Sequence, residues 1–223
     1  ICCDSISINL FKVLSAALKM RPERKVIATT RDNFPTDIYM VQGLLELLGD
    51  EYSVRYIDES NIGSQLSDDI AVLMLTQVNF RTGLKLDMQS ITAQAHDKNI
   101  LTLWDLAHSA GAFPVFVDEC EVDFAVGCTY KYLNGGPGAP AFIYVAERHQ
   151  AQYKQPLSGW MGHSSPFSFS PDYAPDSTVK QNLCGTPGVI GMSILDAALD
   201  VFDGVSLKAV DEKSKKLQAF FIA

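Results

Sequence analysis

The sequence is short of basic residues and has no long apolar run. Its 223 residues include 18 Lys and Arg against 26 Asp and Glu, which gives a net charge of −8. This acidic balance argues against a nucleic-acid-binding protein, which needs a basic stripe. No stretch of about 18 apolar residues appears, so no membrane-spanning helix is predicted. The first residues lack the basic segment and apolar stretch of a secretory signal, so we expect a cytoplasmic protein.

Cysteine spacings that would bind a metal or build a disulfide framework are also missing. The five cysteines stand at positions 2, 3, 120, 128 and 184. They form no Cys-x-x-Cys pair and no zinc-type Cys/His spacing. We therefore interpret them as reduced thiols and predict no metal site.

The two ends lead us to expect a piece of a longer protein. The chain does not begin with Met, and it finishes on the apolar residues Phe-Phe-Ile-Ala at 220–223. A natural terminus rarely leaves such a run uncovered.

Apolar spacing predicts alternating helices and strands. Leu10, Val13, Leu14 and Ala17 recur at helical spacing, with Ser7 as a possible cap. The predicted helices cover 7–20, 35–48 (closed by a glycine), 87–99, 188–202 and 207–221. The predicted strands cover 25–30, 52–57, 70–76, 100–104, 123–128 and 141–145. This alternation indicates an α/β fold, with a mostly parallel sheet covered by helices on both faces.

Two ionisable residues stand out at predicted strand ends, where ligands bind in open α/β sheets. Asp105 ends one apolar strand, and Lys131 follows another. A partly desolvated lysine can form a Schiff base with an aldehyde. A buried aspartate can pair with the ring nitrogen of pyridoxal phosphate. On these two residues alone, however, a plain salt bridge or two solvated strand ends is the favoured explanation.

Five stretches resemble the pyridoxal-phosphate enzymes of the aspartate-aminotransferase fold, and most specifically the kynureninases. One is Val-Asp-Phe-Ala-Val-Gly-Cys-Thr-Tyr-Lys-Tyr-Leu-Asn-Gly-Gly-Pro-Gly at 122–138, and another is Trp-Asp-Leu-Ala-His-Ser-Ala-Gly-Ala at 104–112. The others lie at 4–12, 32–37 and 159–163. The resemblance covers essentially the whole chain. It implies a cofactor-binding large domain of the fold-type-I transferases over 1–205, incomplete at its N-terminus. Over 206–223 it implies the start of a helix leading to a C-terminal small domain.

The resemblance assigns the central chemistry to Lys131. This residue would form the Schiff base with pyridoxal 5′-phosphate and later move the substrate's α-proton. Asp105 would bind the pyridine nitrogen, and His108 would lie beside the ring. Without the resemblance, His108 is better explained as a capping or core histidine.

The resemblance also implies a wall of the cofactor pocket around residue 34. The ring of Phe34 would stack on the pyridine face, with Pro35, Thr36 and Asp37 lining the same wall and Thr76 beside the cofactor. Taken alone, Phe34 is a hydrophobic staple before a helix, and Asp37 is a favourable carboxylate in a first helical turn. A threonine that ends a strand, as Thr76 does, is usually unremarkable.

The phosphate would be bound by hydrogen-bond donors and not by a metal. Ile6 and Ser7, at a helix N-terminus, would supply backbone N–H groups and a hydroxyl. Tyr130 would add a phenolic donor. Trp160 and Thr186 would reach the phosphate from the neighbouring subunit of a homodimer, although Trp160 is equally well explained as a loop anchor.

The implied activity is hydrolysis of the Cβ–Cγ bond of L-kynurenine, 3-hydroxykynurenine or both, in tryptophan catabolism. The products would be anthranilate or 3-hydroxyanthranilate, and L-alanine. A cysteine desulfurase-like lyase is a weaker alternative. Those enzymes usually carry His where Tyr130 precedes Lys131, and the long loop 164–178 has no cysteine for their chemistry. The third alternative is an inactive fragment that keeps only the fold, because the arginine that holds the substrate carboxylate in this family lies outside the chain.

Overall fold

A computed structural model describes residues 1–222, so Ala223, the last residue of the apolar end, lies outside the described part. The strands are β1 (Val26–Thr30), β2 (Ser53–Ile57), β3 (Ile70–Thr76), β4 (Leu101–Asp105), β5 (Phe124–Cys128) and β6 (Ala141–Val145). The α-helices are α1 (Ile6–Met20), α2 (Pro35–Leu48), α3 (Met88–His96), α4 (Glu147–Gln150), α5 (Val189–Leu199) and α6 (Leu207–Ile222). Short 3-10 turns cover Glu59–Asn61, Gly63–Gln65, Trp160–Gly162, Pro166–Ser168, Val179–Asn182 and Asp200–Phe202.

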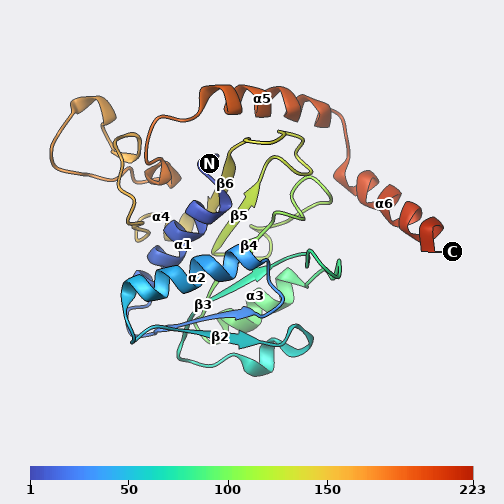
Figure 1. Cartoon of the computed structure of the whole chain (residues 1–223), viewed down its shortest axis with the longest axis horizontal. Helices are drawn as coiled ribbons and strands as arrows, with labels where there is room; N and C mark the ends of the chain where they lie inside the picture. The colour runs from blue at the N-terminus through green and yellow to red at the C-terminus, as the bar shows by residue number, and fades with distance from the viewer. Residues whose placement is uncertain (223) are drawn as a thin grey trace.

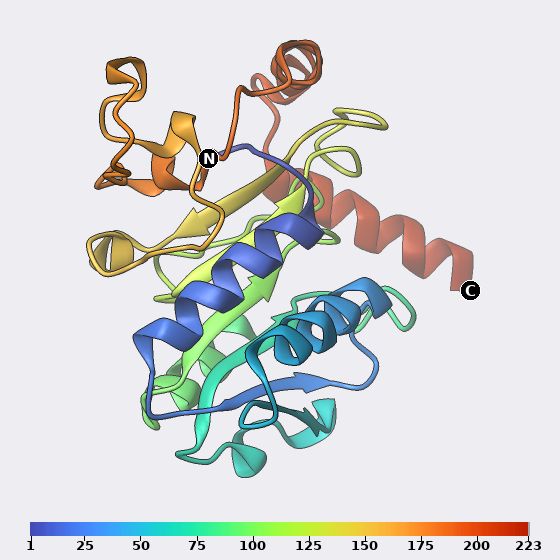
Figure 2. The ribbon, with the colours of Figure 1, turned by 60° about the vertical axis from the view of Figure 1, so that its left-hand side comes forward.

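The strands form one six-stranded sheet in the order β2-β1-β3-β4-β5-β6 (Figure 1). Every neighbouring pair is parallel except β5 and β6, which run antiparallel. Helices α1 and α2 lie over one face, and α3 covers the other (Figure 2). The predicted α/β fold with a mostly parallel sheet is therefore confirmed. Because β1, β3, β4 and β5 are parallel, their carboxyl ends meet at one edge of the sheet.

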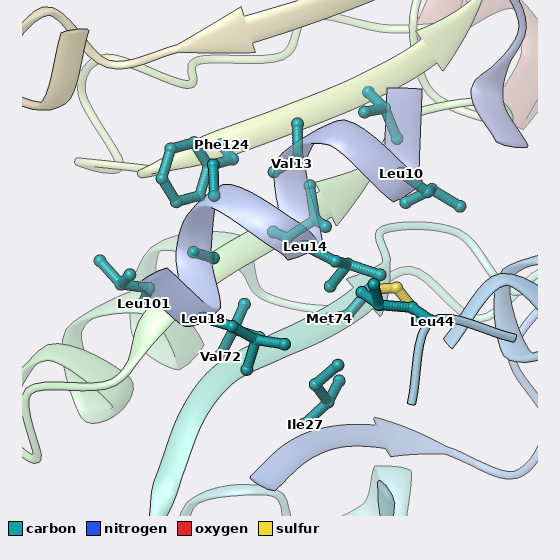
Figure 3. Close-up of a cluster of buried hydrophobic side chains, with 14 of the residues drawn as sticks. Leu10, Val13, Leu14, Leu18, Ile27, Leu44, Val72, Met74, Leu101 and Phe124 are labelled. Atoms are coloured by element: carbon teal, nitrogen blue, oxygen red, sulfur yellow. The ribbon is translucent and has the colours of Figure 1, made fainter. Parts of the chain in front are cut away.

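The larger part of the core lies between the sheet and α1 (Figure 3). Leu10, Val13 and Leu14 point from the helix onto the sheet, where Val72 and Phe124 meet them, and all five are fully or almost fully buried. The spacing of the apolar side chains along α1 matches one helical face, which is why this helix packs lengthwise on the strands.

The second face is covered by α3. Its residues Met88, Ile91 and Ala95 pack with Leu73 and Trp104 of the sheet. Strand β3 contributes alternate side chains to both clusters, and all of its residues are buried. The prediction that this strand is buried on both faces is confirmed.

Helix boundaries differ from the predictions in small ways. Helix α1 begins at Ile6, and its cap is Ser5, whose hydroxyl accepts a hydrogen bond from the Ile8 N–H at 3.4 Å. The prediction that Ser7 is the cap is wrong, because Ser7 already lies in the first turn. Helix α2 begins at Pro35 and is closed by Gly49 at φ 100°, as predicted.

The C-terminal part is less embedded than the rest. Helix α5 crosses one end of the sheet, and α6 projects away from the body (Figure 1). None of the residues of α6 is buried. Within residues 1–222, no helix has both the length and the apolar character needed to cross a bilayer. All five cysteines are free thiols.

Candidate functional site

A cavity of about 190 Å³ lies at the carboxyl edge of the sheet, where β4 and β5 end against the N-termini of α1 and α2. Nine of its lining residues were predicted from the sequence: Ile6, Ser7, Phe34, Thr36, Asp37, Asp105, His108, Tyr130 and Lys131. Residues from four separate stretches of the chain thus meet in one hollow, as expected from the rule that parallel strands bring their ends together.

Lys131 stands just beyond β5 and is half-buried in this cavity. Its Nζ lies 3.0 Å from Nε2 of His108 and 5.7 Å from the ring centres of Phe34 and Tyr130. The chain then turns sharply, with Gly136 at φ 73°, a conformation that favours glycine. The amine is therefore held at the cavity wall, with one imidazole as its hydrogen-bond partner.

Asp105 ends β4 and is 2% exposed. Its Oδ1 accepts a hydrogen bond from the Ala107 N–H at 2.8 Å. Burial raises the pKa of Asp105, although that hydrogen bond and the charge of Lys131 act in the opposite direction. The side chain is thus a buried acid whose charge is only partly compensated.

Asp37, in the first turn of α2, is buried beside Asp105. It is 1% exposed, and among the described residues no N–H or hydroxyl donor reaches either of its carboxylate oxygens, although its carboxyl group lies close enough to that of Asp105 to share a proton with it. Burial raises the pKa of Asp37 well above its usual value, and the negative charge of Asp105 raises it further. We call Asp37 and Asp105 the open carboxylate pair. Because such groups are normally satisfied, this pair is suited to holding a proton or a cationic ligand atom.

The N-terminus of α1 forms another wall, at Ser5, Ile6 and Ser7. The first N–H groups of a helix have no partner within the helix, and the positive end of the helix dipole lies there. An anionic group in the cavity would meet these N–H donors.

Phe34 lines the cavity and is 36% exposed, so it is not the buried staple of the alternative interpretation. Its ring meets Phe80 edge to face at 5.2 Å between centres. The side chain of Asn33 holds the backbone, because its Oδ1 accepts the Phe34 N–H at 2.7 Å. Phe80 and Asn33 were not predicted as site residues, although both lie in the polar stretches that follow β3 and β1. His108 lies in a turn after β4, where it does not cap a helix, and it is half-buried at the cavity wall and not in the core.

Four other predicted residues do not line this cavity: Pro35, Thr76, Trp160 and Thr186. Pro35 is the first residue of α2, and Thr76 donates its hydroxyl hydrogen to the Val78 carbonyl at 3.0 Å. Trp160 meets Phe167 edge to face, at 5.6 Å between ring centres. Thr186 lines a separate cavity of about 340 Å³.

Relatives of this chain are kynureninases. A family model described as Aminotransferase class-V matches residues 51–223. Kynureninase from Deinococcus radiodurans is 53% identical over 219 residues, which cover 98% of this chain and 53% of that protein. Kynureninase from Burkholderia mallei is 48% identical over 225 residues, with 99% of this chain and 54% of that protein covered. The chain spans about half the length of the curated relatives it matches.

Solved structures share the fold at lower identity. An apo cysteine desulfurase from Thermococcus onnurineus NA1 matches with a TM-score of 0.82 at 20% identity, over 98% of this chain and 55% of that one. A mutant of C-DES with glycine covalently linked to the PLP cofactor has a TM-score of 0.80 at 17% identity, over 94% of this chain and 57% of that one. These likenesses show the fold alone, which is that of the large domain of fold-type-I pyridoxal-phosphate enzymes. The family model matches residues 51–223, which are well over half of this chain, and the chain therefore belongs to the aminotransferase class-V family.

Proposed function

We propose that this protein is a pyridoxal 5′-phosphate-dependent kynureninase. It would cleave the Cβ–Cγ bond of L-kynurenine, 3-hydroxykynurenine or both, to anthranilate or 3-hydroxyanthranilate and L-alanine. The observation that carries the proposal is the identity of 48–53% with kynureninases over nearly the whole chain. The cavity at the carboxyl edge supports it, because it gathers the residues that such a cofactor needs.

The open carboxylate pair is the strongest sign that the cavity fits pyridoxal phosphate. Among residues 1–222 no N–H or hydroxyl donor reaches Asp37, whose only carboxyl neighbour is Asp105, and Asp105 itself has one backbone donor. A protonated pyridine nitrogen would bring both the positive charge and the N–H donor that these two carboxyl groups lack. In return, the carboxylates would keep that nitrogen protonated.

The remaining walls suit the other parts of the cofactor. The N–H groups of Ile6 and Ser7 would bind the phosphate, with the phenol of Tyr130 as a further donor. The ring of Phe34 would cover one face of the pyridine. Lys131 supplies the amine for the aldehyde. Each part therefore has a counterpart among the lining residues.

When bound, pyridoxal phosphate supplies an electrophilic aldehyde carbon and a protonated ring that withdraws electrons from the α-carbon of an amino acid. Nζ of Lys131 would hold the aldehyde and, once displaced by the substrate amine, would move the α-proton. Asp105 and Asp37 would orient the ring, and Phe34 would keep water from one face.

We also infer that two copies of the full-length protein form a dimer with shared sites. Trp160 and Thr186, which the family resemblance assigns to the neighbouring subunit's phosphate, lie outside this chain's own cavity. The surface near Trp160 is apolar and exposed, with Phe167 at 72% and Phe169 at 79%. A partner subunit would cover such side chains. Sedimentation of the full-length protein tests this, and a monomer that is active when dilute would contradict it.

Residues 1–205 would form the cofactor-binding domain, and 206–223 would begin the connection to a smaller domain. What supports this division is α6, which leaves the body of the sheet and exposes Leu217 and Phe221. Such side chains on a helix are usually covered by another element. Limited proteolysis of the full-length protein tests the division, and we expect no cleavage between residues 1 and 205 before cleavage near 206.

The deciding experiment supplies the cofactor-loaded full-length protein with L-kynurenine and, separately, with L-cysteine. Kynureninase activity gives anthranilate fluorescence and no sulfide. Release of sulfide from L-cysteine would instead indicate the desulfurase chemistry. A full-length protein that acts on neither and binds no cofactor would contradict the proposal and favour a chain that retains only the fold.

A further inference from the structure

The contact between Lys131 and His108 is not explained by the binding roles above. Nζ of Lys131 lies 3.0 Å from Nε2 of His108, the only side-chain hydrogen bond found for either group within the described residues. This contact joins the amine that must react to a titratable ring at hydrogen-bond distance.

The surrounding charges decide which of the two groups carries the proton. Asp37 from α2 and Asp105 from β4 lie close enough to Lys131 for its positive charge to act on the pKa of each carboxyl group, and burial raises the pKa of the nearby Cys128 thiol. Burial lowers the pKa of His108, and the positive charge of Lys131 lowers it further. At neutral pH the imidazole is therefore neutral, and in the tautomer with its proton on Nδ1 the Nε2 atom accepts a hydrogen bond from Nζ of Lys131.

We propose that His108 is the proton acceptor that activates Lys131 for its reaction with an aldehyde. This inference rests on the proposed function, because it concerns the same lysine and the loading of the same site. It adds a catalytic role in that loading step to the place beside the ring that the family resemblance gives to His108.

The ammonium group of Lys131 transfers one proton to Nε2 of His108, and the freed electron pair on Nζ attacks the aldehyde carbon. One proton then moves from Nζ to the former carbonyl oxygen, which becomes a hydroxyl group, and this group leaves as hydroxide when the C=N bond forms. The imidazolium returns its proton to the departing hydroxide, so water is released and His108 is neutral again. The product is a protonated C=N group on Nζ, and no oxidant or reductant is involved.

The test measures how fast propionaldehyde modifies Lys131 in the full-length protein freed of bound cofactor. Cyanoborohydride traps each product, and peptide mass spectrometry quantifies the labelling. His108→Asn removes the proton acceptor at similar size. We expect labelling of Lys131 at pH 7 to fall about 100-fold, the lower end of what a positioned proton acceptor contributes. Labelling of the exposed Lys19 in the same digest serves as the internal control and should not change.

The pH profile of the unsubstituted protein gives a second test that needs no variant. With His108 as the acceptor, the labelling rate of Lys131 should be nearly level between about pH 6.5 and 8, because the imidazole is already neutral there. A rate that rises about tenfold per pH unit through this range, as for an ordinary lysine, would overturn the proposal. Equal labelling of the His108→Asn variant, folded by circular dichroism, would overturn it as well.

Failure of this inference can be separated from failure of the proposed function. Propionaldehyde has no ring or phosphate, so its reaction does not depend on kynurenine cleavage or on cofactor recognition. A protein that cleaves kynurenine but labels Lys131 independently of His108 contradicts only the role of His108. A protein that does not cleave kynurenine but needs His108 for labelling contradicts only the proposed function.

Discussion

Buried aspartates lie at both edges of the sheet, and they differ in how many hydrogen-bond donors the protein supplies to their carboxylates. Asp123 immediately precedes β5, at its amino end, and its carboxylate accepts hydrogen bonds from His149 at 2.6 Å, Arg148 at 2.7 Å and His96 at 2.8 Å. The backbone N–H of Thr102 adds another at 2.8 Å. We call these five residues the Asp123 cluster. At the carboxyl edge, the open carboxylate pair has few such donors.

The electrostatics of the two groups point in opposite directions. Burial alone would raise the pKa of Asp123, but hydrogen bonds from His149, His96 and Thr102 outweigh it and hold this pKa well below its usual range. The pKa values of Asp37 and Asp105 are raised. The difference teaches that the Asp123 cluster stabilises the fold, whereas the open carboxylate pair is left for a ligand to complete.

The largest effect is expected from removing the amine beside the open carboxylate pair. Lys131→Ala in the full-length protein should lower kcat for kynurenine about 1,000-fold or more, because no group remains to move the α-proton. The unfolding transition in urea should change less than for any variant of the Asp123 cluster. Retention of a tenth of the activity would contradict the role given to Lys131.

Breaking the Asp123 cluster should cost stability and not chemistry. Asp123→Ala leaves Arg148 and two histidines without their buried acceptor, and we expect the free energy of unfolding to fall by about 2–3 kcal/mol, because Arg148 and His96 are partly exposed and can bind water instead. Urea unfolding measures this. Where the variant is folded, its affinity for pyridoxal phosphate should match that of the parent protein. A loss below about 1 kcal/mol would show that the cluster is not a stabilising one.

The matched change at the other edge should have the opposite sign. Asp37→Asn removes an uncompensated charge, so the cofactor-free protein should become about 1 kcal/mol more stable at pH 8. Its affinity for pyridoxal phosphate should fall. Destabilisation together with unchanged affinity would mean that Asp37 serves the fold and not a ligand.

The pH dependence of stability sharpens the same comparison. The raised pKa of Asp37 means that the folded state binds more protons than the unfolded state above about pH 3.9, so its contribution to stability falls as pH rises through that region. The lowered pKa of Asp123 gives a contribution that is present above about pH 3.9 and lost below it. The advantage of Asp37→Asn should therefore grow from pH 4 upward. The penalty of Asp123→Asn should shrink as pH falls below 4.

The smallest expected effects distinguish Ser5, the helix cap, from Ser7, which is proposed to bind the phosphate. Ser5→Ala should destabilise the protein by about 1 kcal/mol, because the hydroxyl that accepts the Ile8 N–H is lost. Ser7→Ala should change the unfolding free energy by less, but should weaken binding of pyridoxal phosphate. Equal stability losses in both variants would contradict the assignment of Ser5 as the cap.

Local patterns in the sequence were sufficient for the fold, whereas most residues of the cavity were predicted from the family resemblance. Apolar spacing located α1 and β3, and the strand-end rule pointed to Asp105 and Lys131. The prediction named Ser7 as the cap, whereas the structure has Ser5. Both serines come before the first apolar residues of the helix face, so the spacing of apolar residues does not choose between them.

The Asp123 cluster was not predicted, although Asp123 lies within a recognised stretch. Its partners come from α3, β4 and α4, which are 21–27 positions away in the sequence. The lack of a hydrogen-bond donor for Asp37 could not be predicted for the same reason, because it depends on every element that packs around this side chain. Trp160 and Thr186 differ again, since a role in a neighbouring subunit is not visible within one chain.

The most direct test of the account is to trap pyridoxal phosphate on the full-length protein with borohydride and map the modified peptide. We predict a single modified lysine, Lys131, and weaker trapping at a fixed cofactor concentration in Asp105→Ala and Asp37→Ala. Modification of another lysine, or trapping that ignores both aspartates, would contradict the claim that the amine and the open carboxylate pair serve one cofactor.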